Sequence, residues 1–154
     1  SIIFFFGREN HPAYLVKDFN YKWCAAQILT EGTDGVIVVS GPMVPKALQA
    51  QELLRAQGKN LTVINSPFIN KVDIKTIGDA LERNQNKLIT IEDHQLIGGM
   101  GAQTVHALKL AGHEFKVKSL AIPGKFGQSA YKADHLYDVY RLSADGIIKA
   151  FKEL

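Results

Sequence analysis

The chain has 154 residues, of which 46% are hydrophobic and 21% charged, and its formal net charge at pH 7 is +3. This composition is too apolar for a disordered chain, and 13 Gly with 5 Pro are too few for a fibrous one. The longest apolar run, residues 2–6, is far shorter than the roughly 20 residues that cross a bilayer. Basic residues stand singly among acidic ones. We therefore expect one folded domain with a full core, without a membrane segment and without a nucleic-acid partner.

The start of the chain and its single cysteine give two further expectations. Cys24 alone can form neither an internal disulfide nor a multi-cysteine metal site, which favours a reducing, cytoplasmic location. We expect Cys24 to be an apolar residue within a strand. Because Ser1 leads directly into an apolar run, residues 1–20 are interpreted as the remnant of a preceding domain with its linker, and residues 21–154 as the folded domain.

Sheet-forming segments come first in chain order. Residues 22–29, the Gly-rich stretch 30–35 and the apolar run from residue 36 predict a strand, a turn and a return strand. From residue 35 to 121, short β-branched runs alternate with longer segments of helical spacing, which is the βαβ pattern. Nearly continuous runs of Val, Ile and Leu at residues 36–40, 61–65, 87–92 and 117–122 predict parallel strands that are covered on both faces. One antiparallel strand is expected to join them.

Helices are predicted between and after these strands, at residues 43–57, 73–83, 100–111, 133–140 and 144–151. Asp73 and Ser143 stand at N-cap positions, and Gly58 stands where a glycine commonly follows a helix. We expect the last two helices to pack across the sheet edge.

The loop after the strand at residues 87–92 carries the densest set of reactive side chains. It reads Glu92-Asp93-His94-Gln95-Leu96-Ile97-Gly98-Gly99-Met100-Gly101. Acidic and imidazole groups at the carboxyl end of a parallel strand can serve acid–base chemistry or hold a cation, and free amides at the following helix can hold an anion. The favoured alternative is structural: the polar side chains hold the loop while the glycines allow close helix–sheet packing.

Other catalytic patterns are incomplete. Residues 127–131 approach the nucleophile elbow of serine hydrolases, but Tyr131 stands where its second glycine is required. The five histidines lack the spacing that places two zinc ligands on one helical face, and there is no dinucleotide fingerprint and no phosphate-binding P-loop. Arg8 follows the apolar run and a glycine, so it stands where an arginine can grip a phosphate; pairing with Glu9 is the alternative.

Three ordered motifs resemble the transketolase-type thiamine diphosphate enzymes. Thr90-Ile91-Glu92-Asp93-His94 with the later Gly98-Gly99-Met100-Gly101 is similar to the family's T-V-E-D-H and G-G-x-G segment. Glu31-Gly32-Thr33-Asp34 before the strand at residue 36 is similar to E-G-x-D, and Phe126-Gly127-Gln128-Ser129-Ala130 to F-G-x-S-G/A. The resemblance covers nearly the whole chain and implies the family's C-terminal domain. The implied fold is a three-layer α/β/α sandwich on a five-stranded, mostly parallel sheet with one antiparallel strand.

The resemblance also implies what the chain lacks. In this family thiamine diphosphate and Mg²⁺ are held by earlier domains, so no catalytic, cofactor-binding or metal-binding residue is expected here, and the chain alone is expected to be inactive. Residues 1–20 would end the preceding pyrimidine-binding domain, and Arg8 would bind the phosphate of a sugar phosphate. The domain would stiffen a homodimer and flank the active-site entrance of an enzyme that transfers two-carbon ketol units in the pentose phosphate pathway.

The sequence also suggests a further binding site and allows several alternatives for the type of protein. We predict an effector or anion site where Glu92, His94, Gly98, Gly99 and Ser129 converge. The alternatives to a transketolase are deoxyxylulose phosphate synthase, the β subunit of a 2-oxo acid dehydrogenase, a non-catalytic small subunit of a split enzyme that binds a partner with the thiamine site, and a flavodoxin-like binder of a small phosphate ligand.

Overall fold

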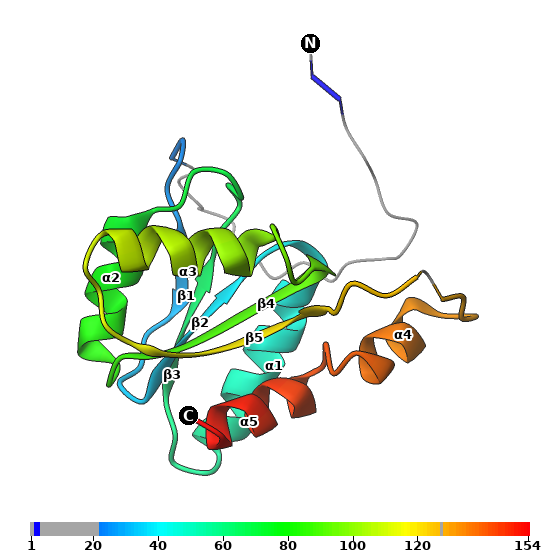
Figure 1. Cartoon of the computed structure of the whole chain (residues 1–154). Helices are drawn as coiled ribbons and strands as arrows, with labels where there is room; N and C mark the ends of the chain where they lie inside the picture. The colour runs from blue at the N-terminus through cyan, green and yellow to red at the C-terminus, as the bar shows by residue number, and fades with distance from the viewer. Residues whose placement is uncertain (1, 4–21, 127) are drawn as a thin grey trace.

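The computed structural model describes residues 2–3, 22–126 and 128–154. Within them, five strands form one sheet and the helices lie in the segments between and after the strands (Figure 1). The strands are β1 (Gln27–Thr30), β2 (Gly35–Val39), β3 (Leu61–Asn65), β4 (Lys87–Gln95) and β5 (Lys116–Ile122). The helices are the short 3-10 helix η1 (Gly41–Met43), α1 (Val44–Arg55), α2 (Ile74–Arg83), α3 (Met100–Leu110), α4 (Ala133–Val139) and α5 (Ala144–Lys152).

The sheet has the strand order β1-β3-β2-β4-β5. β3, β2, β4 and β5 run parallel, and β1 runs antiparallel to β3. The prediction of one antiparallel strand in a parallel sheet is therefore confirmed. The strand–turn–return-strand interpretation is wrong in its pairing, because β1 lies beside β3 while β2 fills the centre of the sheet between β3 and β4.

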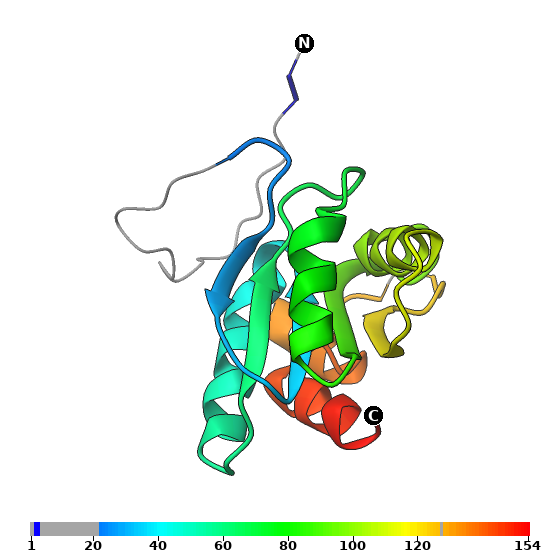
Figure 2. The ribbon, with the colours of Figure 1, turned by 90° about the vertical axis from the view of Figure 1, so that its left-hand side faces the viewer.

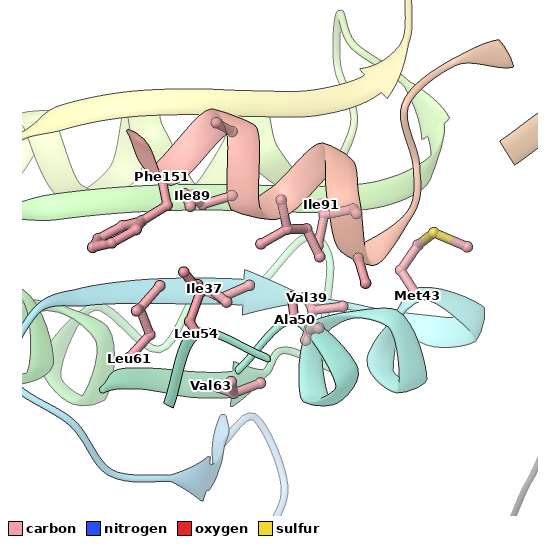
Figure 3. Close-up of a cluster of buried hydrophobic side chains, with 14 of the residues drawn as sticks. Ile37, Val39, Met43, Ala50, Leu54, Leu61, Val63, Ile89, Ile91 and Phe151 are labelled. Carbon is pink, nitrogen blue, oxygen red and sulfur yellow. The ribbon is translucent and has the colours of Figure 1, made fainter. Parts of the chain in front are cut away.

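Helices cover both faces of the sheet, which confirms the three-layer α/β/α sandwich (Figures 1 and 2). α1 and α5 pack on one face and α2 and α3 on the other. Successive residues of a strand point to opposite faces, so Ile37 and Val39 of β2 enter the first core while Val36 and Val38 enter the second. Figure 3 shows the first core, where strand residues meet α1 and Phe151 of α5.

Three predicted helix ends are observed. The Asp73 carboxylate accepts the Thr76 amide at 3.0 Å and the Ser143 hydroxyl oxygen accepts the Gly146 amide at 3.3 Å, so both residues cap their helices. Gly58 follows α1 with φ +76°, a conformation that favours glycine. The last helix packs against α1 and the sheet face rather than across the sheet edge, because its apolar side chains, Ile147 among them, enter the first core.

Two expected strand boundaries are corrected. Cys24 lies in a turn before β1 with φ +60°, rather than within a strand. β4 continues to Gln95, three residues beyond its predicted end, because Gln95 pairs with Ile122 of β5 after an irregularity in the register. Asp93 and His94 therefore belong to the strand and not to the loop that follows it.

The predicted remnant at residues 1–20 lies outside the described residues except for Ile2 and Ile3, so the proposed boundary at residue 21 stays a prediction. No helix in the described part of the chain is long and apolar enough to span a membrane.

Candidate functional site

The side chain of Glu92, on β4, caps the N-terminus of α3. Its side chain is 4% exposed, and its two carboxylate oxygens accept the backbone amides of Met100 at 2.6 Å and Gly101 at 2.8 Å. These amides begin α3, whose own N-cap residue, Gly99, supplies no side-chain acceptor. A carboxylate here satisfies free helix donors and lies at the positive end of the helix dipole. Glu92 therefore holds α3 to the end of β4.

The glycines of this segment make room for that contact. A Cβ atom on Gly99 would lie 2.5 and 2.6 Å from the two Glu92 carboxylate oxygens and would collide with the Gln95 carbonyl oxygen. A Cβ atom on Gly101 would collide with the Thr90 hydroxyl, which itself bonds to Ser119 at 3.0 Å. Thr90 and Glu92 are two residues apart on β4, so their side chains lie on the same face of the sheet, toward α3. The segment from residue 90 to 101 thus fixes a helix closely against a strand.

The segment from residue 31 to 34 has a comparable role at the opposite end of the strands. The Asp34 carboxylate accepts the Asn60 amide at 2.9 Å and also contacts the side chains of Lys59 and Gln85. The Asn60 hydrogen bond, assisted by Lys59 and Gln85, holds the pKa of Asp34 below its usual value despite partial desolvation. A Cβ atom on Gly32 would collide with the Asn60 backbone. Asp34 therefore ties three loops together.

The residues of the predicted effector site differ in their burial and in their contacts. Glu92 and Gly99 are buried in the β4–α3 contact, whereas His94, Gly98 and Ser129 are exposed. Within the described residues, no hydrogen bond joins Ser129 to any of the other four. The amides of Met100 and Gly101, which an anion would require, are already bonded to Glu92. The effector site remains a prediction, and two of its five residues have an evident structural use.

Other predicted residues lie outside the described part. Arg8, Glu9 and His11 fall within residues 4–21, and Gly127 is also excluded, so their roles stay predictions. Among the described residues, no three His, Cys, Asp or Glu side chains gather in a way that could hold a metal ion. No chemistry of a metal or of thiamine diphosphate is assigned to the described residues.

Polar contacts connect α4 to the carboxyl end of the sheet. Lys46 of α1 pairs with Asp134 at 2.9 Å, and the Tyr137 hydroxyl donates to Asp93 at 3.4 Å. The Tyr140 hydroxyl bonds to Gln128 in the loop after β5 at 3.2 Å. α4 has no fully buried residue, but Tyr137 and the following Tyr140 pack against the first core, so apolar and polar contacts together hold α4 beside the strand ends.

Sequence reasoning missed two buried amide side chains. The Gln51 side-chain oxygen accepts the Leu61 amide at 2.8 Å, which joins α1 to the start of β3. Asn84 donates to the Thr62 hydroxyl at 3.1 Å and to the Ala80 carbonyl at 2.8 Å. The helical spacing that places Ala47 and Leu54 in the core also places Gln51 there. A polar residue at an inward position was the available signal for Gln51.

Comparisons with known proteins agree with the architecture. The family model described as "Transketolase, C-terminal domain" matches residues 25–147. A "Putative transketolase C-terminal section" from Methanocaldococcus jannaschii is 32% identical over 127 residues, which are 82% of this chain and 39% of the relative. A "1-deoxy-D-xylulose-5-phosphate synthase" from Desulfitobacterium hafniense strain DCB-2 is 38% identical over 130 residues, which are 84% of this chain and 20% of the relative.

A solved structure described as "Split gene transketolase, inactive beta4 tetramer" superposes with a TM-score of 0.85 and 25% identity, covering 95% of this chain and 46% of its own. The chain thus spans less than half the length of these relatives. The family match covers both structural segments described above, at residues 31–34 and 90–101. The chain belongs to the transketolase C-terminal domain family.

Proposed function

We propose that this chain is the C-terminal domain of a thiamine diphosphate-dependent transketolase, which transfers a two-carbon ketol unit between sugar phosphates in the pentose phosphate pathway. In this proposal it contributes to the dimer and to the rim of the active site, and is inactive alone. The observation that carries the structural role is the use of Glu92: its buried carboxylate is fully engaged with the amides of α3 and is not presented to a substrate.

The proposed contact with substrate comes from the start of the chain. The stretch Gly7-Arg8-Glu9-Asn10-His11-Pro12 resembles the family segment whose arginine binds the sugar phosphate. We assign that role to Arg8, because a guanidinium group can donate two parallel hydrogen bonds to a phosphate. Thiamine diphosphate and Mg²⁺ would be held by partner domains or a partner subunit.

The test is to mix this chain with the thiamine-binding portion of the same enzyme and to measure ketol transfer from xylulose 5-phosphate. We expect activity from the mixture and none from either part alone. Arg8→Ala should raise KM for the sugar phosphate, whereas Lys22→Ala, an exposed control near the first strand, should leave it unchanged. An unchanged KM in Arg8→Ala would refute the role of Arg8, and an inactive mixture that assembles normally would refute the transketolase assignment.

Deoxyxylulose phosphate synthase is the second candidate. The 38% identity to the Desulfitobacterium synthase exceeds the 32% identity to the Methanocaldococcus section over a similar length. The two parts should therefore also be mixed with pyruvate and glyceraldehyde 3-phosphate and assayed by mass spectrometry for 1-deoxyxylulose 5-phosphate, with release of CO₂. Formation of this product without ketol transfer would replace the transketolase proposal.

The assembly and location are also proposals. A homodimer of the parent enzyme and a cytoplasmic location are expected, and the chain is also suited to be the smaller subunit of a split enzyme. The matched split-gene structure is described as a β4 tetramer, which is a property of that protein. Light scattering of this chain alone and after mixing with the thiamine-binding portion would give the stoichiometry; a mixture that stays as separate components would contradict the partnership.

A further inference from the structure

An open surface cavity of about 270 Å³, lined mostly by exposed side chains, lies where the end of β5 meets the turn between α4 and α5. In Figure 1 the chain leaves β5, runs out to α4 and returns to α5, and residues from both stretches line this open space. Its polar lining comes from the loop after β5 and from the α4–α5 turn: Lys125, Gln128, Tyr140 and Arg141. Pro123 and Val139 contribute apolar surface.

The lining is cationic. Among the described residues, Lys125 and Arg141 both line the cavity, and no acidic side chain does. Neither head group has a hydrogen-bond or ion-pair partner within the described part of the chain. Glu153 lies close enough for Arg141 to influence its pKa, but its carboxylate is bonded to Lys118 at 3.0 Å. Two cations are therefore left available to a ligand.

The neutral polar groups add donors to this lining. The Tyr140 hydroxyl donates to the side-chain oxygen of Gln128 at 3.2 Å. The oxygen of Gln128 is thus engaged, and its amide nitrogen keeps two N–H groups to donate. A cavity lined by donors and positive charge matches an oxyanion.

The backbone of Arg141 allows its side chain to be removed without strain. Arg141 has φ +60° immediately after the end of α4, and the Leu142 amide bonds to the Tyr137 carbonyl at 2.7 Å, as in a Schellman helix end. Glycine adopts this conformation without steric cost, whereas a residue with a Cβ atom does not. The local fold therefore tolerates glycine at this position, as it would at Gln85 and Asn86, which have φ +57° and +52°.

We propose that this cavity binds a phosphate group, free or carried by a small metabolite, with the Arg141 guanidinium as a two-point donor and Lys125 as the second positive charge. Two cations match the charge of a phosphate dianion, and the planar guanidinium matches the spacing of two phosphate oxygens. Pro123 and Val139 offer apolar contact to the organic part of a phosphate ester. The proposal does not depend on ketol transfer.

The test is an NMR titration of the ¹⁵N-labelled chain with inorganic phosphate, with ribose 5-phosphate, and with acetate as a carboxylate control. We expect saturable shifts of the amides at residues 124–128 and 139–142 with phosphate, and weaker ones with acetate. Tighter binding of ribose 5-phosphate than of inorganic phosphate would identify an esterified ligand, and equal binding would identify a site for the phosphate group alone.

Arg141→Gly separates ligand binding from folding. It removes the guanidinium but suits the backbone, so the unfolding temperature should be unchanged or higher while phosphate binding weakens about tenfold or more. Lys125→Gln should weaken binding as well, and Lys71→Gln, an exposed lysine outside the cavity, should not. Wild-type affinity in Arg141→Gly, the absence of shifts at millimolar phosphate, or equal shifts with acetate would overturn the proposal.

Discussion

Gly99 and the carboxylate of Glu92 lie so close that a Cβ atom on Gly99 would be 2.5 and 2.6 Å from the two carboxylate oxygens. The backbone of Gly99 has φ −75° and ψ −176°, which residues with side chains adopt freely. Space, and not backbone conformation, therefore requires glycine here. The close approach lets a strand carboxylate reach the amides that begin α3.

Gly99→Ala should destabilise the domain, because the added methyl group displaces the Glu92 carboxylate from the α3 amides. We expect a loss of about 1–3 kcal/mol in the free energy of unfolding, measured by urea denaturation. Ile97→Ala changes an 88% exposed side chain of the same loop and should shift stability by less than about 0.5 kcal/mol. Equal stability of Gly99→Ala and the wild type would contradict the described contact.

Glu92→Gln tests the charge and the second acceptor oxygen of the same contact. The substituted side chain keeps its size but presents an N–H group toward a backbone N–H donor, which leaves a buried donor unsatisfied. The expected loss in the free energy of unfolding is about 1–3 kcal/mol. The control is Glu52→Gln, an exposed glutamate on α1. If Glu92→Gln lost no more unfolding free energy than Glu52→Gln, the Glu92 cap would not contribute to stability.

Stability should fall in acid because of Asp34 and Asp73. A hydrogen bond from the Asn60 amide lowers the pKa of Asp34. Desolvation by itself would raise the pKa of Asp73, but hydrogen bonds from the backbone amides of Thr76 and Ala26 outweigh it, so this pKa is lowered too. A carboxyl group whose pKa is lower in the folded state stabilises the fold at pH values above its unfolded-state pKa of about 3.9. This contribution is lost as the pH falls through the folded-state pKa.

The measurement is urea denaturation from pH 6 down to pH 2. Asp34→Asn with Asp73→Asn should flatten the decline in unfolding free energy below about pH 4. Asp138→Asn changes an exposed carboxylate and should leave the decline as in the wild type. A double variant with the wild-type pH profile would show that these two groups do not carry the acid sensitivity.

Gly78 and His113 give a test of the packing between α2 and the segment after α3. A Cβ atom on Gly78 would collide with the His113 imidazole, whose side chain is 22% exposed. Alanine otherwise stabilises a helix interior by about 0.5–1 kcal/mol relative to glycine. In the His113→Ala background, Gly78→Ala should therefore raise the free energy of unfolding by this amount. In the wild-type background it should raise it by less or lower it. Additive effects in the double-mutant cycle would contradict the contact.

Local sequence signals were sufficient for most of the elements. Runs rich in Val, Ile and Leu predict β2 and β3 because buried parallel strands are apolar on both faces. The edge strand β5 was also predicted, although none of its residues is buried and the expected cover on both of its faces is wrong. The caps at Asp73 and Ser143 were readable because a short polar side chain satisfies amides only two or three residues away. Interactions of this kind depend on sequence neighbours alone.

The boundaries that failed depend on distant partners. β1 pairs with β3 and not with β2, and this choice depends on which edge of the sheet remains open. β4 extends to Gln95 because Ile122, 27 positions later, offers a pairing partner. Neither partner is visible in the local pattern of hydrophobic and polar residues.

The candidate site also combines features that the sequence predicts with features that depend on the tertiary structure. The sequence by itself determined the family, the alternation of strands and helices, and the positions of the Glu- and Gly-containing motifs. Only the tertiary structure decided that Glu92 is a helix cap, because a carboxylate's role depends on which donors surround it. Likewise, Lys125 and Arg141 are scattered in sequence, and the return of the chain from β5 through α4 brings them to one cavity. Local periodicity determines the elements, whereas long-range packing determines which polar groups are satisfied and which remain available to a ligand.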